Sequence, residues 1–198
     1  MLLLEAHQLK LYVKDRLLID IPNLQIHSHD RIGFIGRNGS GKTTLLNILA
    51  GKQSPENGNV IIHATCKLLP QLKRLDTMKS GGEVTQEYIV EAIAENPEIL
   101  FADEPTTNLD TEHIEWLEKT LKNWQGAYVI VSHDRAFLDS LCTKIWEINE
   151  GRLNEFKGNY SDYERQKERI HREQKQAYEK YVHKKEQLEE ALKLKEKK

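Results

Sequence analysis

Short apolar segments separated by polar turns occupy the first seventy residues of the chain. They cover 2–11, 17–21, 24–26, 31–35, 60–62 and 66–69. Segments of this length predict strands, and we expect the first three to be antiparallel strands that lead into the strand at 31–35. The apolar residues of 44–50 predict a helix directly after that strand.

The middle of the chain alternates strands with helices. Continuous apolar runs at 99–102 and 128–131 are typical of buried parallel strands. We expect helices over 83–96, 112–122 and 135–141. Pro97 would end the first of these helices, and Thr111 can cap the second. This order predicts a parallel sheet with covering helices.

A charge-dense segment without glycine or proline follows from Tyr160. Its apolar residues are Tyr163, Ile170, Ala177, Tyr181, Leu188 and Ala191. Their separations are mostly multiples of seven or four, which predicts one long helix with a single apolar seam, interrupted at Lys184. Either an antiparallel coiled coil with a later segment or a solvated terminal helix would explain this pattern.

Composition limits the class of protein. The chain has 198 residues, 38% of them hydrophobic and 30% charged, which favours one main soluble domain. We expect no signal peptide and no membrane span, and Cys66 and Cys142 are interpreted as reduced cytosolic thiols without a function. The net charge of −2 divides unevenly: residues 1–150 hold 15 basic and 21 acidic residues, whereas 151–198 hold 14 and 10. The tail is therefore basic.

A glycine-rich loop carries the strongest chemical signal. Residues 36–43 read Gly36, Arg37, Asn38, Gly39, Ser40, Gly41, Lys42 and Thr43, which satisfies the G-x-x-x-x-G-K-[ST] pattern between a predicted strand and a predicted helix. Glycines let consecutive backbone N–H groups surround a phosphate, while the helix directs the positive end of its dipole at it. Lys42 adds a cation, and Thr43 offers a hydroxyl to a phosphate-bound Mg²⁺. The loop predicts nucleotide binding.

Polar side chains follow the two buried strands. Asp103 and Glu104 come after the strand at 99–102, where Asp103 would hold a metal through water and Glu104 would orient or deprotonate a water molecule. His133 follows the next strand and is predicted to contact the γ-phosphate. Gln71, near the end of an earlier strand, could reach the metal or the water. These positions predict an ATPase site.

A second backbone-exposing element precedes the helix at 83–96. Ser80, Gly81 and Gly82 could bind another anion at the start of that helix. Because one γ-phosphate does not need two such elements from one chain, we expect this element to serve a nucleotide held by a second domain of the same kind.

The ordered set of motifs resembles an ATP-binding cassette domain. Residues 36–43, Gln71, 80–83, 99–105, 108–110 and 132–134 resemble its Walker A, Q-loop, signature, Walker B, D-loop and H-loop. Residues 104–110, 132–138 and 156–163 further resemble the ABC-F group, whose members lack a transmembrane part and act on the ribosome. Residues 79–84 resemble the Vga-type resistance proteins, specifically their N-terminal cassette.

The resemblance implies a fold and a division of the chain. The fold is α/β: a P-loop cassette with a mixed sheet, an antiparallel β subdomain, a much reduced helical subdomain and a long charged C-terminal helix. Residues 1–158 would form the cassette, and 159–198 would begin an interdomain coiled-coil linker. The implied cofactors are ATP and Mg²⁺. The implied partners are a second cassette, in the same protein or in a second copy, and the ribosome with its rRNA.

The resemblance also implies roles for individual residues. Tyr12 would stack on adenine, and Gly36 through Thr43 with Thr44 would bind the phosphates. Thr43, Gln71 and Asp103 would hold Mg²⁺, while Ser80, Gly81, Gly82 and Asp110 would act where two cassettes meet. Glu104 would be the catalytic base and His133 the γ-phosphate sensor. The implied function is cytoplasmic ribosome protection against lincosamides, streptogramin A and pleuromutilins.

Three departures from the family pattern leave rival interpretations open. Only eight residues separate Gln71 from Ser80, which argues against a transporter. Lys79 and Tyr88 replace the leucine and the arginine that are usual around the signature helix. The chain ends at Lys198, so we interpret it as a fragment or a truncated product. The main alternative is the ATPase subunit of a transporter. A nucleotide-binding module without turnover and a DNA-repair ATPase are further alternatives.

Overall fold

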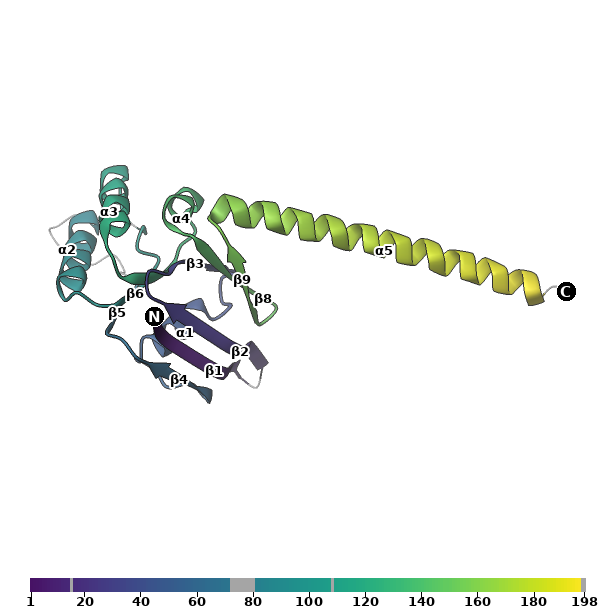
Figure 1. The fold of residues 1–198 in the computed structure, drawn as a ribbon, viewed down its shortest axis with the longest axis horizontal. Helices are drawn as coiled ribbons and strands as arrows, with labels where there is room; N and C mark the ends of the chain where they lie inside the picture. Colours follow the sequence, from purple (N-terminus) through teal and green to yellow (C-terminus); the bar gives the residue numbers. More distant parts are fainter. Residues whose placement is uncertain (15, 72–80, 108, 197–198) are drawn as a thin grey trace. The chain divides into compact units, whose positions relative to one another are not determined.

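The computed structural model describes residues 1–14, 16–71, 81–107 and 109–196 (Figure 1). It divides into two compact units, 1–160 and 161–198. The first unit contains two sheets and four helices within these described ranges, and the second belongs to a single helix.

The smaller sheet is antiparallel, with strand order β2-β1-β4. Its strands are β1 (Leu2–Val13), β2 (Arg16–His27) and β4 (Asn57–Ile62). The prediction of two separate strands at 17–21 and 24–26 is wrong, because β2 continues through Pro22. As an edge strand, β2 pairs on one side only, so a residue without an N–H group need not interrupt the ladder.

The larger sheet is mixed and has strand order β5-β6-β7-β3-β8-β9. Its strands are β5 (Cys66–Leu69), β6 (Ile99–Asp103), β7 (Ala127–Val131), β3 (Arg31–Gly36), β8 (Lys144–Asn149) and β9 (Arg152–Lys157). Adjacent strands from β5 to β8 are parallel, and β9 is antiparallel to β8. The sequence analysis did not predict β8 or β9. These strands form a hairpin, and the residues of its tight turn, Glu150 and Gly151, both have positive φ.

The helices of the first unit are α1 (Lys42–Leu49), α2 (Gly81–Ala94), α3 (Thr111–Asn123) and α4 (Arg135–Leu141). Thr111 was predicted as the cap of α3, but Asp110 occupies that position and its side chain accepts a hydrogen bond from the His113 N–H. Asp has the stronger preference for this position because its carboxylate also complements the helix dipole.

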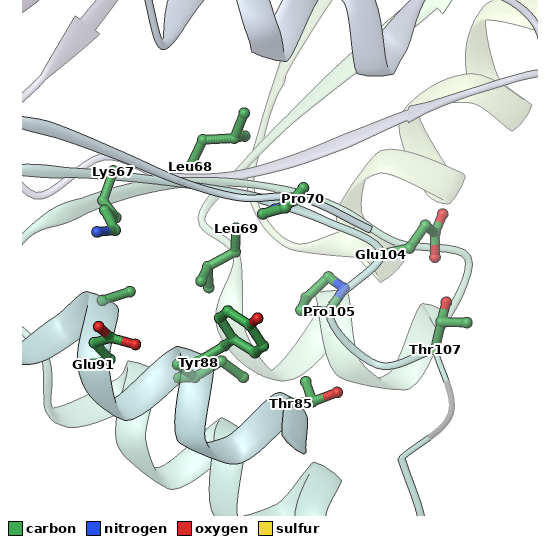
Figure 2. A pocket seen from close by; sticks show the side chains of 12 residues that line it. Lys67, Leu68, Leu69, Pro70, Thr85, Tyr88, Glu91, Glu104, Pro105 and Thr107 are labelled. Carbon is green, nitrogen blue, oxygen red and sulfur yellow. The ribbon is translucent and has the colours of Figure 1, made fainter. Parts of the chain in front are cut away.

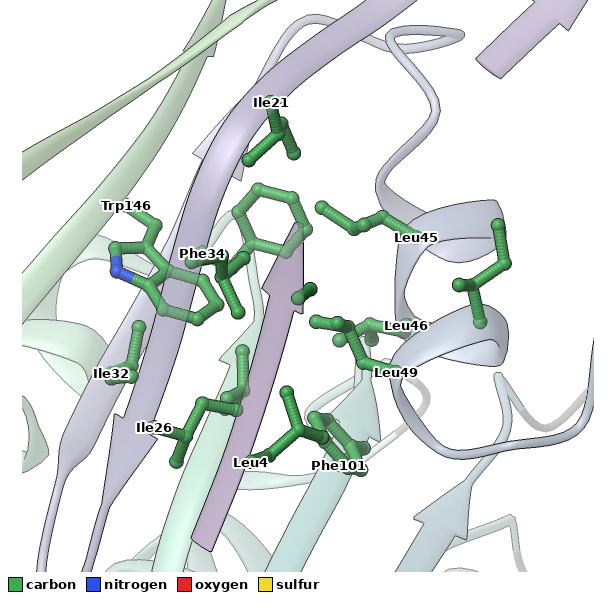
Figure 3. Packing of buried hydrophobic residues seen from close by; sticks show 14 of the residues in the cluster. Leu4, Ile21, Ile26, Ile32, Phe34, Leu45, Leu46, Leu49, Phe101 and Trp146 are labelled. Atoms are coloured by element: carbon green, nitrogen blue, oxygen red, sulfur yellow. The ribbon is translucent and has the colours of Figure 1, made fainter. Parts of the chain in front are cut away.

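Aliphatic side chains of α1 pack in the core with both sheets (Figure 3). Leu45, Leu46 and Leu49 are fully buried, as is Leu4 of β1. Phe34 of β3 meets Trp146 of β8 edge to face, with ring centroids 6.2 Å apart. This packing fixes the first turn of α1 beside the end of β3, where the glycine-rich loop lies.

The helix α5 (Tyr160–Glu196) contains most of the second unit. Tyr178, Tyr181 and Leu188 are exposed along it, while Arg169 pairs with Glu173 one turn later. The prediction of a long charged helix is confirmed, and the coiled-coil pairing stays a prediction. Within the described ranges, none of the helices is both long and apolar enough to cross a membrane.

The α/β fold class with a mixed sheet, an antiparallel sheet and a C-terminal helix is confirmed. The five strands from β5 to β8 are parallel, as expected from the strand and helix order. The parallel register matters for the site, because Phe34 of β3 and Asp103 of β6 both pair with Val131 of β7. The carboxyl ends of these three strands therefore lie at one edge of the sheet.

Candidate nucleotide-binding site

A cavity of about 520 Å³ lies at the carboxyl ends of β3, β6 and β7. It is lined by Val13, Leu18, Asn38, Gly39, Gly41, Lys42, Thr43, Thr44, Gln71, Asp103, Glu104, Thr107, Val131 and His133. Ligands of open α/β sheets bind at this edge. The structure thus brings together residues that are up to 120 positions apart in the sequence, from Val13 to His133.

The glycine-rich loop needs its glycines for two different reasons. Gly39 and Gly41 have φ of 76° and 94°, in the left-handed region that favours glycine. At Gly41, which caps α1, a Cβ atom would also lie 2.8 Å from Ile19 Cδ1 and 2.9 Å from Leu18 Cδ2. The loop can therefore pass close to the β2 side chains and present backbone N–H groups at the start of α1.

Lys42 lies within the loop and is almost buried. Its Nζ donates hydrogen bonds to the carbonyl oxygens of Gly36, at 2.9 Å, and Arg37, at 3.1 Å. Burial lowers the pKa of Lys42, while the charges of Glu104 and Asp103 oppose that shift. A phosphate would offer this ammonium group a stronger, charge-assisted acceptor than either carbonyl.

Thr43 and Asp103 form the second contact of the site. The Thr43 hydroxyl donates to Asp103 Oδ2 at 2.6 Å, and Gln71 lines the same cavity. A hydroxyl, a carboxylate and an amide oxygen are hard oxygen donors of the kind that Mg²⁺ takes alongside phosphate and water. The donor set fits the predicted metal, although its role as a metal site stays a prediction.

Glu104 combines a strained backbone with a confined side chain. Its φ is 51°, unusual for a residue other than glycine, and its N–H donates to the Val131 carbonyl at 2.9 Å. The side chain is 13% exposed, and Oε1 lies 3.3 Å from His133 Nε2 without making a hydrogen bond to any described residue. Burial raises the pKa of Glu104, and the nearby His133 partly offsets this shift. Strain and a raised pKa together are typical of a functional carboxylate.

The side chain of His133 contacts the glycine-rich loop. Its Nε2 lies 3.1 Å from Asn38 Oδ1. Because an amide oxygen only accepts, this contact assigns a proton to Nε2. The same nitrogen lies 3.3 Å from Glu104 Oε1, so His133 Nε2 is close to both the loop and the carboxylate.

A second cavity, of about 260 Å³, adjoins the first (Figure 2). Leu69, Tyr88 and Pro105 line its middle, and Lys67 and Glu91 lie at the end away from Glu104. Glu104 and Thr107 line both cavities. The segment that carries the candidate base therefore forms part of the wall between them.

Several predicted site residues lie outside the nucleotide cavity. Tyr12, which pairs with Leu17, is not among the described residues lining it. Asp110 lies at the start of α3, where hydrogen bonds from His113 lower its pKa. Gly81 and Gly82 begin α2, and Ser80, Lys79 and Asn108 lie outside the described residues. The roles of Ser80, Gly81, Gly82 and Asp110 at a second cassette stay predictions, as does the stacking of Tyr12 on adenine.

Four residues that line the cavity were not predicted as site residues. Val13 and Leu18 come from the β1–β2 hairpin, Thr107 follows Glu104 by three positions, and Val131 ends β7. The family resemblance pointed to Tyr12 of this hairpin, but nothing in the sequence marks Val13 or Leu18, because their position beside the loop depends on how the two sheets pack. Thr107 could have been found from its proximity to Glu104.

The buried carboxylate predicts a pH-dependent stability difference for Glu104→Gln. Below the ordinary pKa of 4.5, Glu104 is protonated in both the folded and the unfolded chain, so its charge costs nothing. As the pH rises through the raised folded pKa, the unfolded chain ionises first and the wild type loses stability relative to the variant. Urea unfolding at pH 4 to 7 should show this difference growing with pH. Glu150→Gln, at an exposed residue with φ of 50°, is the control; equal trends for both variants would contradict the prediction.

The fold and the site define a nucleotide-binding cassette. Two family models, both described as ABC transporter, match residues 19–71 and 146–197. Together they cover more than half of the chain, which belongs to the ATP-binding cassette family. A nucleotide-free ATP-binding cassette from an ABC transporter has a similar fold, with a TM-score of 0.72 and 15% identity over 83% of this chain and 94% of that one.

Named relatives confirm the resemblance to the ABC-F group. Ribosome protection protein VmlR of Bacillus subtilis (strain 168) is 33% identical over 192 residues, covering 85% of this chain and 35% of the relative. Erythromycin resistance ATP-binding protein MsrA of Staphylococcus epidermidis is 34% identical over 195 residues, covering 86% and 40%. Energy-dependent translational throttle protein EttA of Escherichia coli (strain K12) is 30% identical, covering 84% and 38%. The chain spans about two fifths or less of the length of these relatives.

Proposed function

We propose that this chain binds and hydrolyses ATP as one cassette of a protein that acts on the ribosome. The observation that carries the proposal is the convergence of Lys42, the Thr43–Asp103 contact and the Glu104–His133 contact in one cavity. These groups match what phosphoryl transfer requires. Lys42 is a cation, Thr43 and Asp103 are oxygen donors, Glu104 is a base and His133 is a proton donor. The family supports ATPase activity in general.

In the proposed mechanism, Lys42 exchanges the Gly36 and Arg37 carbonyls for phosphate oxygens. Thr43, Gln71 and Asp103 would hold Mg²⁺, which supplies positive charge to the phosphates when bound. Glu104 accepts the proton of the attacking water, and its raised pKa favours that transfer. His133 donates its Nε2–H to a γ-phosphate oxygen and holds the transferred group in place.

We propose that the site is completed by a second cassette. Asp110 is not among the described residues that line the nucleotide cavity, which is consistent with service to a partner's nucleotide, and we propose the same service for Ser80, Gly81 and Gly82. Two nucleotides would then be held between two cassettes, supplied by the same protein or by a second copy. Hydrolysis would release this clamp.

The proposed target is the ribosome, and the proposed outcome is protection against lincosamides, streptogramin A and pleuromutilins. The names of the relatives VmlR, MsrA and EttA concern ribosome protection, erythromycin resistance and translation. Residues 151–198 carry 14 basic and 10 acidic residues, which suits a surface rich in RNA phosphates. The description of the family models supports the transporter alternative, whereas the names of VmlR, MsrA and EttA favour the ribosome. We therefore propose a cytoplasmic site of action.

Sedimentation with ribosomes tests the proposed target. In the presence of ATP, the chain should sediment with purified ribosomes and should relieve inhibition of in vitro translation by a lincosamide. Glu104→Gln should sediment with ribosomes but should not sustain the rescue, because the clamp would not be released. Failure of the wild type both to associate and to rescue, together with binding to membrane vesicles, would favour the transporter alternative.

A further inference from the structure

The strand β4 lies at an edge of the antiparallel sheet, where β1 is its one neighbour among the described strands (Figure 1). The N–H of His63, directly after β4, donates to the Leu3 carbonyl of β1 at 2.9 Å. The backbone groups of successive residues in an antiparallel strand point to opposite sides. Ile61 therefore directs its N–H and C=O toward β1, as His63 does, and Val60 and Ile62 direct theirs away from the sheet.

The strand β4 lacks the features that usually prevent an edge strand from pairing. Charged residues and proline on an edge strand oppose pairing with another chain. Within the described residues, β4 consists of Asn57, Gly58, Asn59, Val60, Ile61 and Ile62, without charge or proline. The other strands at sheet edges carry these features, which are Arg16, Asp20 and Pro22 in β2, Lys67 in β5, and Arg152, Glu155 and Lys157 in β9. The edge of β4 is therefore open to pairing.

The side chains of β4 suit pairing on both faces of the sheet. Ile61 is 40% exposed and lies opposite Glu5, on the face away from the core. Ile62 is 38% exposed and lies opposite the buried Leu4, on the core face. Because β-branched side chains pack well against neighbours on a pleated surface, a further strand beside β4 would cover apolar area on each face.

A second copy of β4 fits this edge. Two uncharged strands meet without like-charge repulsion, and antiparallel pairing about a two-fold axis uses the same patch on both copies. Val60 of one copy would lie opposite Ile62 of the other, with backbone hydrogen bonds at both ends of the contact, and Ile61 would lie opposite its own counterpart. A register centred on Val60 would instead require Gly58 to pair with Ile62. The φ of Gly58 is 85°, outside the strand region, which disfavours that register.

We propose that β4 is a self-association surface, through which two copies of the chain join their three-stranded sheets into one continuous antiparallel sheet. This contact differs from the proposed clamp around nucleotides, because no residue of β4 is among the described residues that line the nucleotide cavity. It requires neither ATP nor the ribosome, so it does not rest on the proposed function. A contact along one short strand buries little area, and we expect a dissociation constant of about 10 μM to 1 mM.

Sedimentation equilibrium without nucleotide tests the proposal. The wild type should change from monomer toward dimer as its concentration rises from about 1 μM to 1 mM. Ile61→Lys should weaken the association about tenfold or more, because two lysines would lie directly opposite each other. Val90→Lys is the matched control, since Val90 is 52% exposed but lies on α2, and it should leave the association unchanged. A wild type that stays monomeric, or equal association of Ile61→Lys and the wild type, would overturn the proposal.

Disulfide formation tests the register of the two strands. Under mild oxidation Ile61→Cys should give a covalent dimer, because directly opposite residues of an antiparallel pair lie within the reach of a disulfide. Asn59→Cys should not, because Asn59 would lie four residues, roughly 13 Å, from its counterpart. The wild type, with Cys66 and Cys142, gives the background. No covalent dimer of Ile61→Cys, or equal amounts with Asn59→Cys, would overturn the proposal. Neither experiment measures hydrolysis, so the proposed function stands or fails separately.

Discussion

Replacing Glu104 by glutamine is expected to lower ATP hydrolysis by about 100- to 10,000-fold while nucleotide binding stays within a few-fold of the wild type. Glutamine keeps the shape of the side chain and its distance from His133, but it cannot accept a proton from water. The carboxylate has few other contacts to lose, because its Oε1 makes no hydrogen bond to a described residue. The loss should therefore fall on the chemical step.

Phosphate release at saturating ATP, compared at equal chain concentrations, measures this effect. Repeating the measurement at several chain concentrations also tests for a shared site. Phosphate release per chain should rise with chain concentration if two copies must meet. Glu150→Gln is a matched control, since Glu150 has nearly the same φ as Glu104 but lies in the exposed turn between β8 and β9. Unchanged release by Glu104→Gln would contradict its role as the base.

Replacing Lys42 by methionine is expected to weaken ATP binding by roughly 30- to several-thousand-fold, which corresponds to about 2–5 kcal/mol. The ammonium group is held beside two loop carbonyls and is nearly buried, so its pairing with phosphate would take place largely out of water. Methionine fills a similar volume without the charge. The fold should persist, because the core side chains of α1 are unchanged.

Calorimetry with ATP measures the loss, and thermal unfolding without nucleotide checks the fold. Lys52→Met removes the same charge just beyond α1, at an exposed position, and should leave affinity within about twofold. Equal affinities for Lys42→Met and the wild type would show that the glycine-rich loop does not bind the triphosphate through this lysine.

Much of the site could be predicted because several of its residues are contiguous in the sequence. The loop from Gly36 to Thr43 contains its glycines, cation and hydroxyl in one segment. Asp103 and His133 could be placed at the same edge of the sheet because Asp103 ends one buried parallel strand and His133 lies two residues after another. Local pattern and strand order were sufficient for these residues.

Other features could not be predicted from local pattern. The strand β2 runs through Pro22, because the edge position of that strand removes the usual cost of proline. The cap of α3 is Asp110 rather than Thr111, a difference of one residue that depends on the backbone conformation at the helix start. The error at β2 arose because the pairing with a neighbouring strand decides whether proline is tolerated. The error at α3 arose because two adjacent residues were both suited to the cap position.

The sequence by itself predicted the class of chemistry: a phosphate-binding loop, oxygen donors for a metal and a carboxylate that follows a buried strand. Only the tertiary structure decided that Asn38 meets His133, that Glu104 is confined beside it, and that Val13 and Leu18 rather than Tyr12 line the cavity. The physical reason is that these contacts join residues far apart in the chain. Their distances depend on the packing of β1 and β2 against α1 and the larger sheet, which no local pattern encodes.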